Sequence, residues 1–218
     1  MITTDAVPGR THSPPRALAV AGMIFAVFMA SGLCIIRLAI PDDPAHPGAW
    51  VADPASRNAV RFALNLVPFS GIAFLWFVGV FRDRVGNRED RFFATVFLGS
   101  SVLFVASLFG AAAIAGSLVE MVGAGETAAS DHHTYYFGRW AADMFMNVFA
   151  IKMAGMFMFS SSTIALRTAI LPRWVAFSGF VCGVILLLVI THWLWIALVF
   201  PIWVLLVSIE ILLAGGEA

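Results

Sequence analysis

The chain has 218 residues, of which 61% are hydrophobic and only 12% charged, and its mean hydropathy is +0.91. A water-soluble domain of this composition would precipitate, so the sequence predicts an integral membrane protein. The formal net charge is zero. This argues against nucleic acid as a partner, because phosphate recognition needs clustered Lys and Arg.

The apolar residues gather into stretches of transmembrane length. A spanning helix needs about 20 apolar residues to cross about 30 Å of hydrocarbon. Six stretches meet this requirement: 17–40, 59–81, 92–122, 137–166, 174–190 and 193–213. We therefore predict an all-α fold, a polytopic transmembrane bundle of six spans forming a single domain, 16–214. Short cytoplasmic tails, 1–15 and 215–218, flank it, and the first lacks the basic start of a signal peptide.

The last two stretches form one apolar block that is interrupted only by Thr191 and His192. One helix of about 40 residues would overshoot any membrane. We therefore predict a very tight outer turn at these two residues.

Arginines in the short connections predict the orientation. With the N-terminus in the cytoplasm, the outer loops carry only Arg57. The inner connections carry Arg10, Arg16, Arg82, Arg84, Arg88, Arg91, Arg167 and Arg173. Because cytoplasmic loops are enriched in Lys and Arg, we expect both termini in the cytoplasm of a multi-pass protein of the cell (plasma) membrane, of the bacterial inner-membrane type.

Charged residues within spans cost about 3 kcal/mol each on insertion scales, so they usually face a partner, a cavity or water. All but one of those in this chain fall near the outer ends of the predicted spans. The candidate ligand-binding residues are Arg37, Arg61, Asn65, Glu120, Arg139, Asp143, Asn147 and Lys152.

Spacing arranges several of these residues into stripes. Arg61 and Asn65 are four residues apart, as are Arg139, Asp143 and Asn147, so each set lies along one face of its helix. Glu120 continues a row of small side chains, Ala106, Gly110, Ala113 and Ser117. Such a row predicts a helix-packing face that turns Glu120 toward another helix.

These charges admit two interpretations. They can form a polar pocket that opens to the outside and binds a ligand or an ion. Alternatively, Arg139 and Asp143 neutralise each other along one helix, while Arg37, Arg61 and Glu120 extend to the interface. The sequence leaves both open.

Lys152 lies near the middle of its predicted span, too far from either end to reach a headgroup easily. It is nine residues from Asp143, which places the two on opposite helix faces. The partner we expect is a carboxylate from another helix, although Glu210 lies at a different depth. The alternatives are a neutral amine packed among Phe149 and Met153, or exposure to internal water.

Two prolines predict irregular helices. Pro68 removes one hydrogen bond inside the second span and should kink it, and Pro201 should do the same in the sixth. Broken helices line substrate sites in many transporters, but transmembrane helices also tolerate proline without a function.

No cofactor is expected. The methionines of the fourth span are interpreted as packing residues. His132 and His133 are weak metal-ligand candidates at most, because adjacent histidines in a loop rich in Gly and Ala need no ligand. The sequence also lacks the histidine spacing of membrane cytochromes, di-iron enzymes and zinc proteases.

The segment Ala21 to Phe25, together with Arg37 and the exit Ile40, Pro41, Asp42 into an acidic loop, resembles uncharacterised bacterial and actinobacterial multi-spanning membrane proteins. The stretch from Glu89 to Thr95 is similar to them as well. The resemblance covers about the first half of the chain. It implies the membrane architecture and no activity.

Three functions follow as hypotheses. The first is small-molecule or ion transport, or ligand binding, through an outward-facing charged pocket. The second is an accessory or assembly subunit of a larger membrane complex, or a homo-oligomer, in contact with membrane lipids. The third is a lipid-modifying enzyme that acts through Asp143 or Glu120.

Overall fold

The computed structural model describes residues 15–40, 50, 53–86, 91–123, 132–188 and 194–214. Within these residues every regular element is helical, which confirms the all-α prediction. The helices are α1 (Pro15–Ala39), α2 (Pro54–Val85), α3 (Arg91–Gly123), α4 (His132–Asp143), α5 (Ile151–Thr168), α6 (Arg173–Leu188) and α7 (Val199–Ala214). A π-helical segment (Met144–Ala150) joins α4 to α5, and a 3₁₀ segment (Leu194–Leu198) leads into α7. The predicted tails up to residue 14 and after residue 214, most of the outer loops and the turn at Thr191 and His192 lie outside the described residues.

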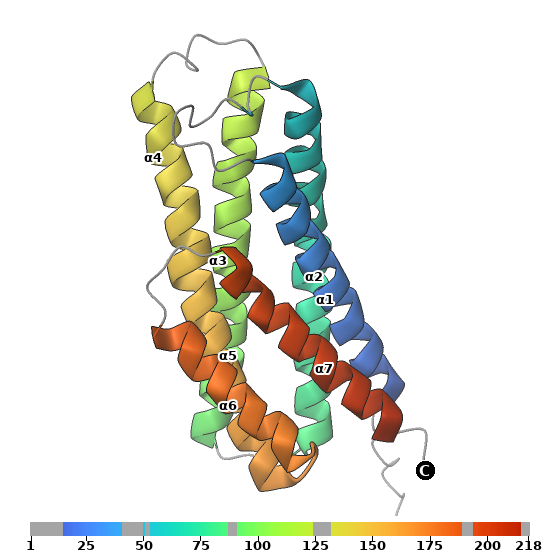
Figure 1. The fold of residues 1–218 in the computed structure, drawn as a ribbon. Helices are drawn as coiled ribbons and strands as arrows, with labels where there is room; N and C mark the ends of the chain where they lie inside the picture. The colour runs from blue at the N-terminus through green and yellow to red at the C-terminus, as the bar shows by residue number, and fades with distance from the viewer. Residues whose placement is uncertain are drawn as a thin grey trace, which may run out of the picture.

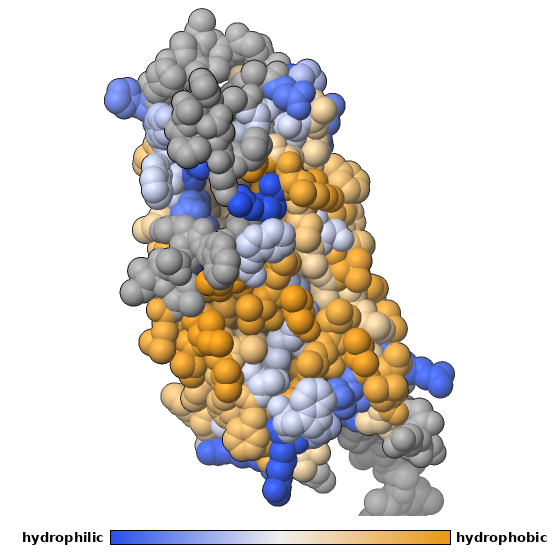
Figure 2. Space-filling view, in the orientation of Figure 1, coloured by the Kyte–Doolittle hydropathy of each residue, from blue (hydrophilic) through white to orange (hydrophobic). Residues whose placement is uncertain are grey.

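Five helical stretches are long and apolar enough to cross a membrane: Arg16–Ala39, Pro54–Val85, Phe92–Met121, His133–Thr168 and Trp195–Ala214. The sixth predicted span, α6, is apolar but has 16 residues, about 24 Å of helix, which is short of the hydrocarbon thickness. Figure 2 shows apolar residues over the sides of the molecule and hydrophilic ones gathered toward its ends. The chain thus has the helices of a membrane protein, with five or six of spanning character.

The helices extend over different lengths of the bundle. In Figure 1, α6 and α7 cover only the lower half, whereas α2, α3 and the α4–α5 rod continue to the opposite end. α7 packs on α1, and α6 packs on α5. α1 begins and α7 ends at the lower end. The described helix ends include Arg16, Arg82, Arg84, Arg91, Arg167 and Arg173.

The N-terminal start of α2 is fixed by local hydrogen bonds. The Asp53 carboxylate accepts from the backbone N–H groups of Ala55 at 3.2 Å and Ser56 at 3.0 Å, and from the Ser56 hydroxyl at 2.7 Å. These groups are among the donors that a helix start leaves without partners. Pro54 follows at the first helical position, where no N–H is needed. The hydrogen bonds from Ser56 lower the pKa of the Asp53 carboxyl below its usual value.

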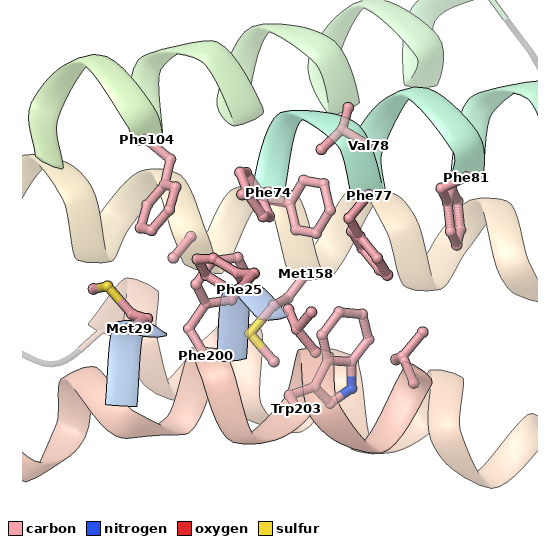
Figure 3. Close-up of a cluster of buried hydrophobic side chains, with 14 of the residues drawn as sticks. Phe25, Met29, Phe74, Phe77, Val78, Phe81, Phe104, Met158, Phe200 and Trp203 are labelled. Atoms are coloured by element: carbon pink, nitrogen blue, oxygen red, sulfur yellow. The ribbon is translucent and has the colours of Figure 1, made fainter. Parts of the chain in front are cut away.

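Aromatic rings fill the centre of the bundle. Phe74 of α2 is fully buried, and its ring lies 4.9 Å from that of Phe25, 5.1 Å from those of Phe104 and Phe157, and 5.5 Å from that of Phe200. Figure 3 shows the rings of Phe25, Phe74, Phe104 and Phe200 together with Met29 and Met158. Five helices therefore meet at one cluster of edge-to-face and tilted rings.

Glycines allow the closest helix contacts. A Cβ on Gly155 of α5 would lie 2.9 Å from the carbonyl oxygen of Gly183 of α6, and a Cβ on Gly183 would lie 3.0 Å from the carbonyl oxygen of Gly155. Gly22 of α1 likewise leaves room for the Ser208 side chain of α7. Small residues promote helix association in this way because lipid provides little hydrophobic driving force.

The prediction of an irregular helix at Pro201 needs correction. Pro201 does not interrupt α7, since it lies in the first turn, where a missing N–H costs little. The irregularity precedes it as the 3₁₀ segment. Pro68 lies inside α2, which is one helix up to Val85, and the kink expected there stays a prediction.

The small-residue row of α3 is not a packing face within this chain. Ala106, Ala113 and Ser117 are exposed. Only Gly110 makes the predicted close contact, because a Cβ there would lie 2.9 Å from the Phe145 ring. The buried face of α3 is offset from the row and carries large residues such as Phe104 and Leu108.

Candidate functional site

A cavity of about 650 Å³ lies between α1, α2, α3 and α4 in the half of the bundle that α6 and α7 leave uncovered. Figure 2 shows hydrophilic residues between α4 and α1 in this half. The lower half of the same face is apolar. The volume is that of a typical small-molecule site, and its walls are mostly apolar. Among the described residues, five non-aromatic lining residues are polar or charged: Arg37, Ser70, Arg139, Asp143 and Asn147.

Helix contacts give the depth of the outer groups. A Cβ on Gly138, next to Arg139, would touch Leu118. Ala39, Val60 and Val119 form one buried cluster. Arg37 and Arg139 therefore lie near the same level, toward the upper end of the bundle in Figure 1, on opposite walls. Tyr135, Tyr136, Trp140, Trp50 and Trp195 add aromatic rings to the lining.

Contacts at the other end place two neutral polar groups at the inner level. The Phe69 ring, beside Ser70, packs on Phe28 of α1 with centroids 6.4 Å apart. A Cβ on Gly71 would touch Phe109, and one on Gly110 would touch Phe145, two residues before Asn147. Ser70 of α2 and Asn147 of the π-helical segment thus lie at similar depth.

The floor of the cavity is apolar. Met29 and Met146 line both the cavity and a small void of about 10 Å³ that also touches Phe104 and Phe200. Beyond these residues lies the buried phenylalanine cluster. A molecule that passed from the cavity to the other end would have to displace those rings.

The polar stripe of α4 continues across an irregular helix. Asn147 Nδ2 donates to Asp143 Oδ1, so the two side chains that the sequence places four apart are joined. The π-helical segment begins directly after Asp143 and contains Asn147. Such wide turns are rare and are often found at functional sites.

Two polar atoms at the inner level have open hydrogen-bonding capacity. Ser70 is 1% exposed, and its Oγ has no hydrogen-bond partner among the residues that the structure describes. Asn147 Oδ1 is buried and is likewise without a partner within that part of the chain. Leaving such an atom unpaired costs about 1–3 kcal/mol. Both residues line the cavity, but the two oxygen atoms themselves are fully buried and do not face its open space.

The structure separates three predicted site residues from the cavity. Arg61 Nε donates to Glu120 Oε1 at 2.8 Å on the outside of α2 and α3, where the side chains are 43% and 66% exposed. Asn65 Nδ2 donates to the Arg61 carbonyl of its own helix. None of the three lines the cavity. Glu120 does face another helix, as predicted, but as half of an exposed ion pair.

Replacing Arg61 by Gln, or Glu120 by Gln, should therefore change the free energy of unfolding by less than about 1 kcal/mol, the usual worth of an exposed ion pair. Ligand binding in the cavity should be unchanged. Detergent unfolding and a binding assay check both expectations. Strong loss of binding in either variant would return these residues to the site.

Lys152 is also separate from the cavity. Its Nζ donates to the carbonyl oxygens of Leu186 at 3.1 Å and Leu187 at 2.7 Å. These carbonyls belong to the last turn of α6, where a helix leaves its oxygens without intrahelical donors and carries partial negative charge. The hydrogen-bond partner of Lys152 is thus the C-terminal end of α6 and not, as predicted, a carboxylate from another helix.

No group of three or more His, Cys, Asp or Glu able to hold a metal ion occurs within the described part of the chain. His133 is exposed on the first turn of α4. His132 begins that helix, and its side chain lies outside what the structure describes.

Sequence reasoning missed Ser70 and the aromatic lining of the cavity. Ser70 follows Pro68 and Phe69 in an apolar helix, and its position on the cavity face becomes clear only when α1 and α3 are placed. One signal was available, because Ser70 lies at about the same distance into its helix from the outer end as Asn147 does. No family model matches the chain, and no curated protein or solved structure matches it either.

Proposed function

We propose that the chain binds an amphipathic small molecule in the cavity between α1 and α4, as a ligand-binding or transport protein. The observation that carries this proposal is the cavity itself, which combines apolar walls with Arg37, Arg139 and Asp143. Charged groups beside a cavity within a membrane bundle are expensive to keep, and they commonly mark a ligand or ion path. Arg61, Asn65, Glu120 and Lys152 are not part of the proposed site.

We also propose six spans, both termini in the cytoplasm and a plasma-membrane location. The arginines of the lower end support this topology, because such residues favour the cytoplasmic side. In this arrangement the cavity lies toward the outer surface. An amphiphile would reach it from the outside or from the outer leaflet.

A cavity-filling substitution tests the proposal. Ala115 of α3 lines the cavity, whereas Ala113 of the same helix is exposed and does not. In nanodiscs, Ala115→Phe should bind radiolabelled decanoate at least about tenfold more weakly than wild type, a difference of about 1.4 kcal/mol. Ala113→Phe is the matched control and should bind as wild type does. Equal binding by all three proteins would overturn the proposal.

A measurement of uptake distinguishes transport from ligand binding alone. Proteoliposomes that accumulate decanoate faster than protein-free liposomes, with loss of the effect in Ala115→Phe, would assign transport. Binding without uptake would assign a receptor or carrier role. The floor of methionine and phenylalanine side chains makes uptake dependent on a second conformation.

A second candidate is an accessory subunit, and the exposed row of Ala106, Ala113 and Ser117 on α3 favours it. Small residues on a lipid-facing helix permit another helix to approach closely. Purification in mild detergent tests this function. A larger partner recovered in fixed ratio would support it, and a monomer or homo-oligomer would count against it.

A further inference from the structure

We infer that the ligand of the cavity is a single-chain anionic amphiphile. Arg139, Tyr135 and Tyr136 would bind its charged head group, and its hydrocarbon tail would run toward the floor of the cavity. The inference rests on the proposed function, since it names the chemical class of the molecule that the cavity would hold. The two ends of the cavity supply separate observations for the head group and for the tail.

Three donor groups lie together on one face of α4. Tyr135 and Tyr136 precede Arg139 by four and three residues, which places all three side chains on the same side of the helix. All three line the cavity, and Arg139 and Tyr136 are exposed. The tyrosine rings contact each other, with centroids 5.8 Å apart. Neither the guanidinium group nor the two hydroxyls make a hydrogen bond or ion pair with another residue in the part of the chain that the structure describes.

This set of donors fits an anion. A guanidinium group only donates hydrogen bonds and keeps its charge, and a phenol hydroxyl can donate as well. The one carboxylate of α4, that of Asp143, accepts from Asn147, and it forms no ion pair with Arg139 among the described residues. Arg37 and Asp143 have interactions of their own, so the charge available to a ligand is taken as that of Arg139 alone. A carboxylate or phosphate can accept from all three donors and bind the guanidinium group in two-pronged geometry.

The other end of the cavity favours a hydrocarbon tail. Met29, Leu108 and Met146 are among the residues that line it. The oxygen atoms of Ser70 and Asn147 are fully buried there and do not face the open space, so a ligand meets apolar side chains. A polar group in such surroundings would lose its hydrogen bonds to water without replacement, whereas an alkyl end gains by leaving water.

The dimensions of the cavity favour one chain of medium length. Arg139 and Met146 are seven residues apart on the α4–α5 rod, roughly 10 Å along its axis. Met146 also lines the small void below the cavity, beside Phe104 and Phe200. The volume of about 650 Å³ is that of a pocket for a drug-sized ligand. A single alkyl chain with its head group matches this size, and a two-chain phospholipid exceeds it.

Three probes with a ten-carbon chain test the head group: decanoate, decanol and decyltrimethylammonium. Wild-type protein in phosphatidylcholine nanodiscs should bind decanoate about tenfold more tightly than decanol, and should bind the cation no more tightly than decanol. Arg139→Gln should remove the preference for decanoate and leave decanol binding unchanged, which also shows that the variant is folded. Arg139→Lys should keep most of the preference. Arg61→Gln is the matched control, because Arg61 is an arginine near the same end of the bundle that does not line the cavity.

Two further measurements test the tyrosines and the tail. Tyr136→Phe should weaken decanoate binding by about fivefold, through the loss of one hydrogen bond, and leave decanol binding unchanged. ω-Hydroxydecanoate should bind wild type about tenfold more weakly than decanoate, because its terminal hydroxyl would meet the apolar floor. Equal or tighter binding of ω-hydroxydecanoate would overturn the apolar tail. Decyl phosphate should depend on Arg139 as decanoate does, and the tighter binder of the two identifies the preferred head group.

The outcomes separate the inference from the proposed function. If no probe binds wild type better than it binds Ala115→Phe, the proposed function fails. If decanoate and decanol both bind wild type better than Ala115→Phe but with equal affinity, and Arg139→Gln changes neither, the proposed function stands and the anionic head group is overturned.

Discussion

Replacing Gly183 with valine is expected to separate α6 from α5 and to destabilise the protein by on the order of 3 kcal/mol. The Cβ would lie 3.0 Å from the Gly155 carbonyl oxygen, and the Phe159 backbone nitrogen is only 3.4 Å away. Backbone atoms cannot rotate aside as a side chain does, so one helix has to move. The free energy of unfolding in a mixed detergent series measures the effect.

Gly79→Val is the matched control for this prediction. Gly79 is also within a helix, and a Cβ there meets nothing within 4 Å. Both substitutions change helix propensity in the same way, so the difference between them isolates the helix contact. Equal stability of the two variants would show that α5 and α6 do not meet at Gly155 and Gly183.

A local probe of the same contact is available in the chain itself. Cys182 precedes Gly183 and is half-buried, and the other thiol is Cys34. In a Cys34→Ser background, Gly183→Val should speed maleimide labelling of Cys182, because the two helices no longer cover each other. Gly79→Val should leave the rate as it is.

The helices and their approximate ends were predictable because each is a long apolar stretch. A spanning segment must satisfy its own backbone, so length and hydropathy alone indicate where the helices lie. The π-helical segment at Met144 to Ala150 was not predictable, because the residues there are those of an ordinary apolar helix. Phe145 of this segment lies close to Gly110 of α3, a neighbour that is far away in the sequence.

The candidate site was predictable in part. The polar stripe on the fourth predicted span indicated Arg139, Asp143 and Asn147 as site residues. The position of Arg37 near the end of its predicted span indicated that residue. All four line one cavity. Depth also suggested Arg61 and Glu120, which are at the same end of the bundle but on its outside. Sequence position indicates the level of a side chain along a helix more readily than the direction that the side chain faces. That direction decides which charged side chains share a cavity.

The short α6 explains why a lysine is tolerated in the middle of the bundle. In Figure 1 the end of α6 lies beside the middle of the α4–α5 rod, well below the upper end of the molecule. Its last carbonyl groups therefore end beside the middle of this rod, and in a membrane bundle unpaired carbonyls at such a level are costly. Lys152 supplies donors to two of them. It is the only lysine in the chain.

Lys152→Met should consequently destabilise the protein by about 2 kcal/mol. Methionine preserves much of the side-chain volume and avoids burying a charge, which offsets part of the loss. The remaining cost is that of the Leu186 and Leu187 carbonyls, which lose the donors of Lys152. Lys152→Arg should retain most of the stability, because a guanidinium group also donates to a helix end.

The effect should be strongest at the end of α6. Hydrogen exchange in Lys152→Met should increase in the last turn of α6 and remain near wild type in α1 and α2, whose contacts do not involve Lys152. Cys182 labelling should rise less than in Gly183→Val, since the glycine contact between α5 and α6 is preserved. If unfolding and exchange in Lys152→Met both match wild type, another donor serves these carbonyls, and the position of the lysine needs a different explanation.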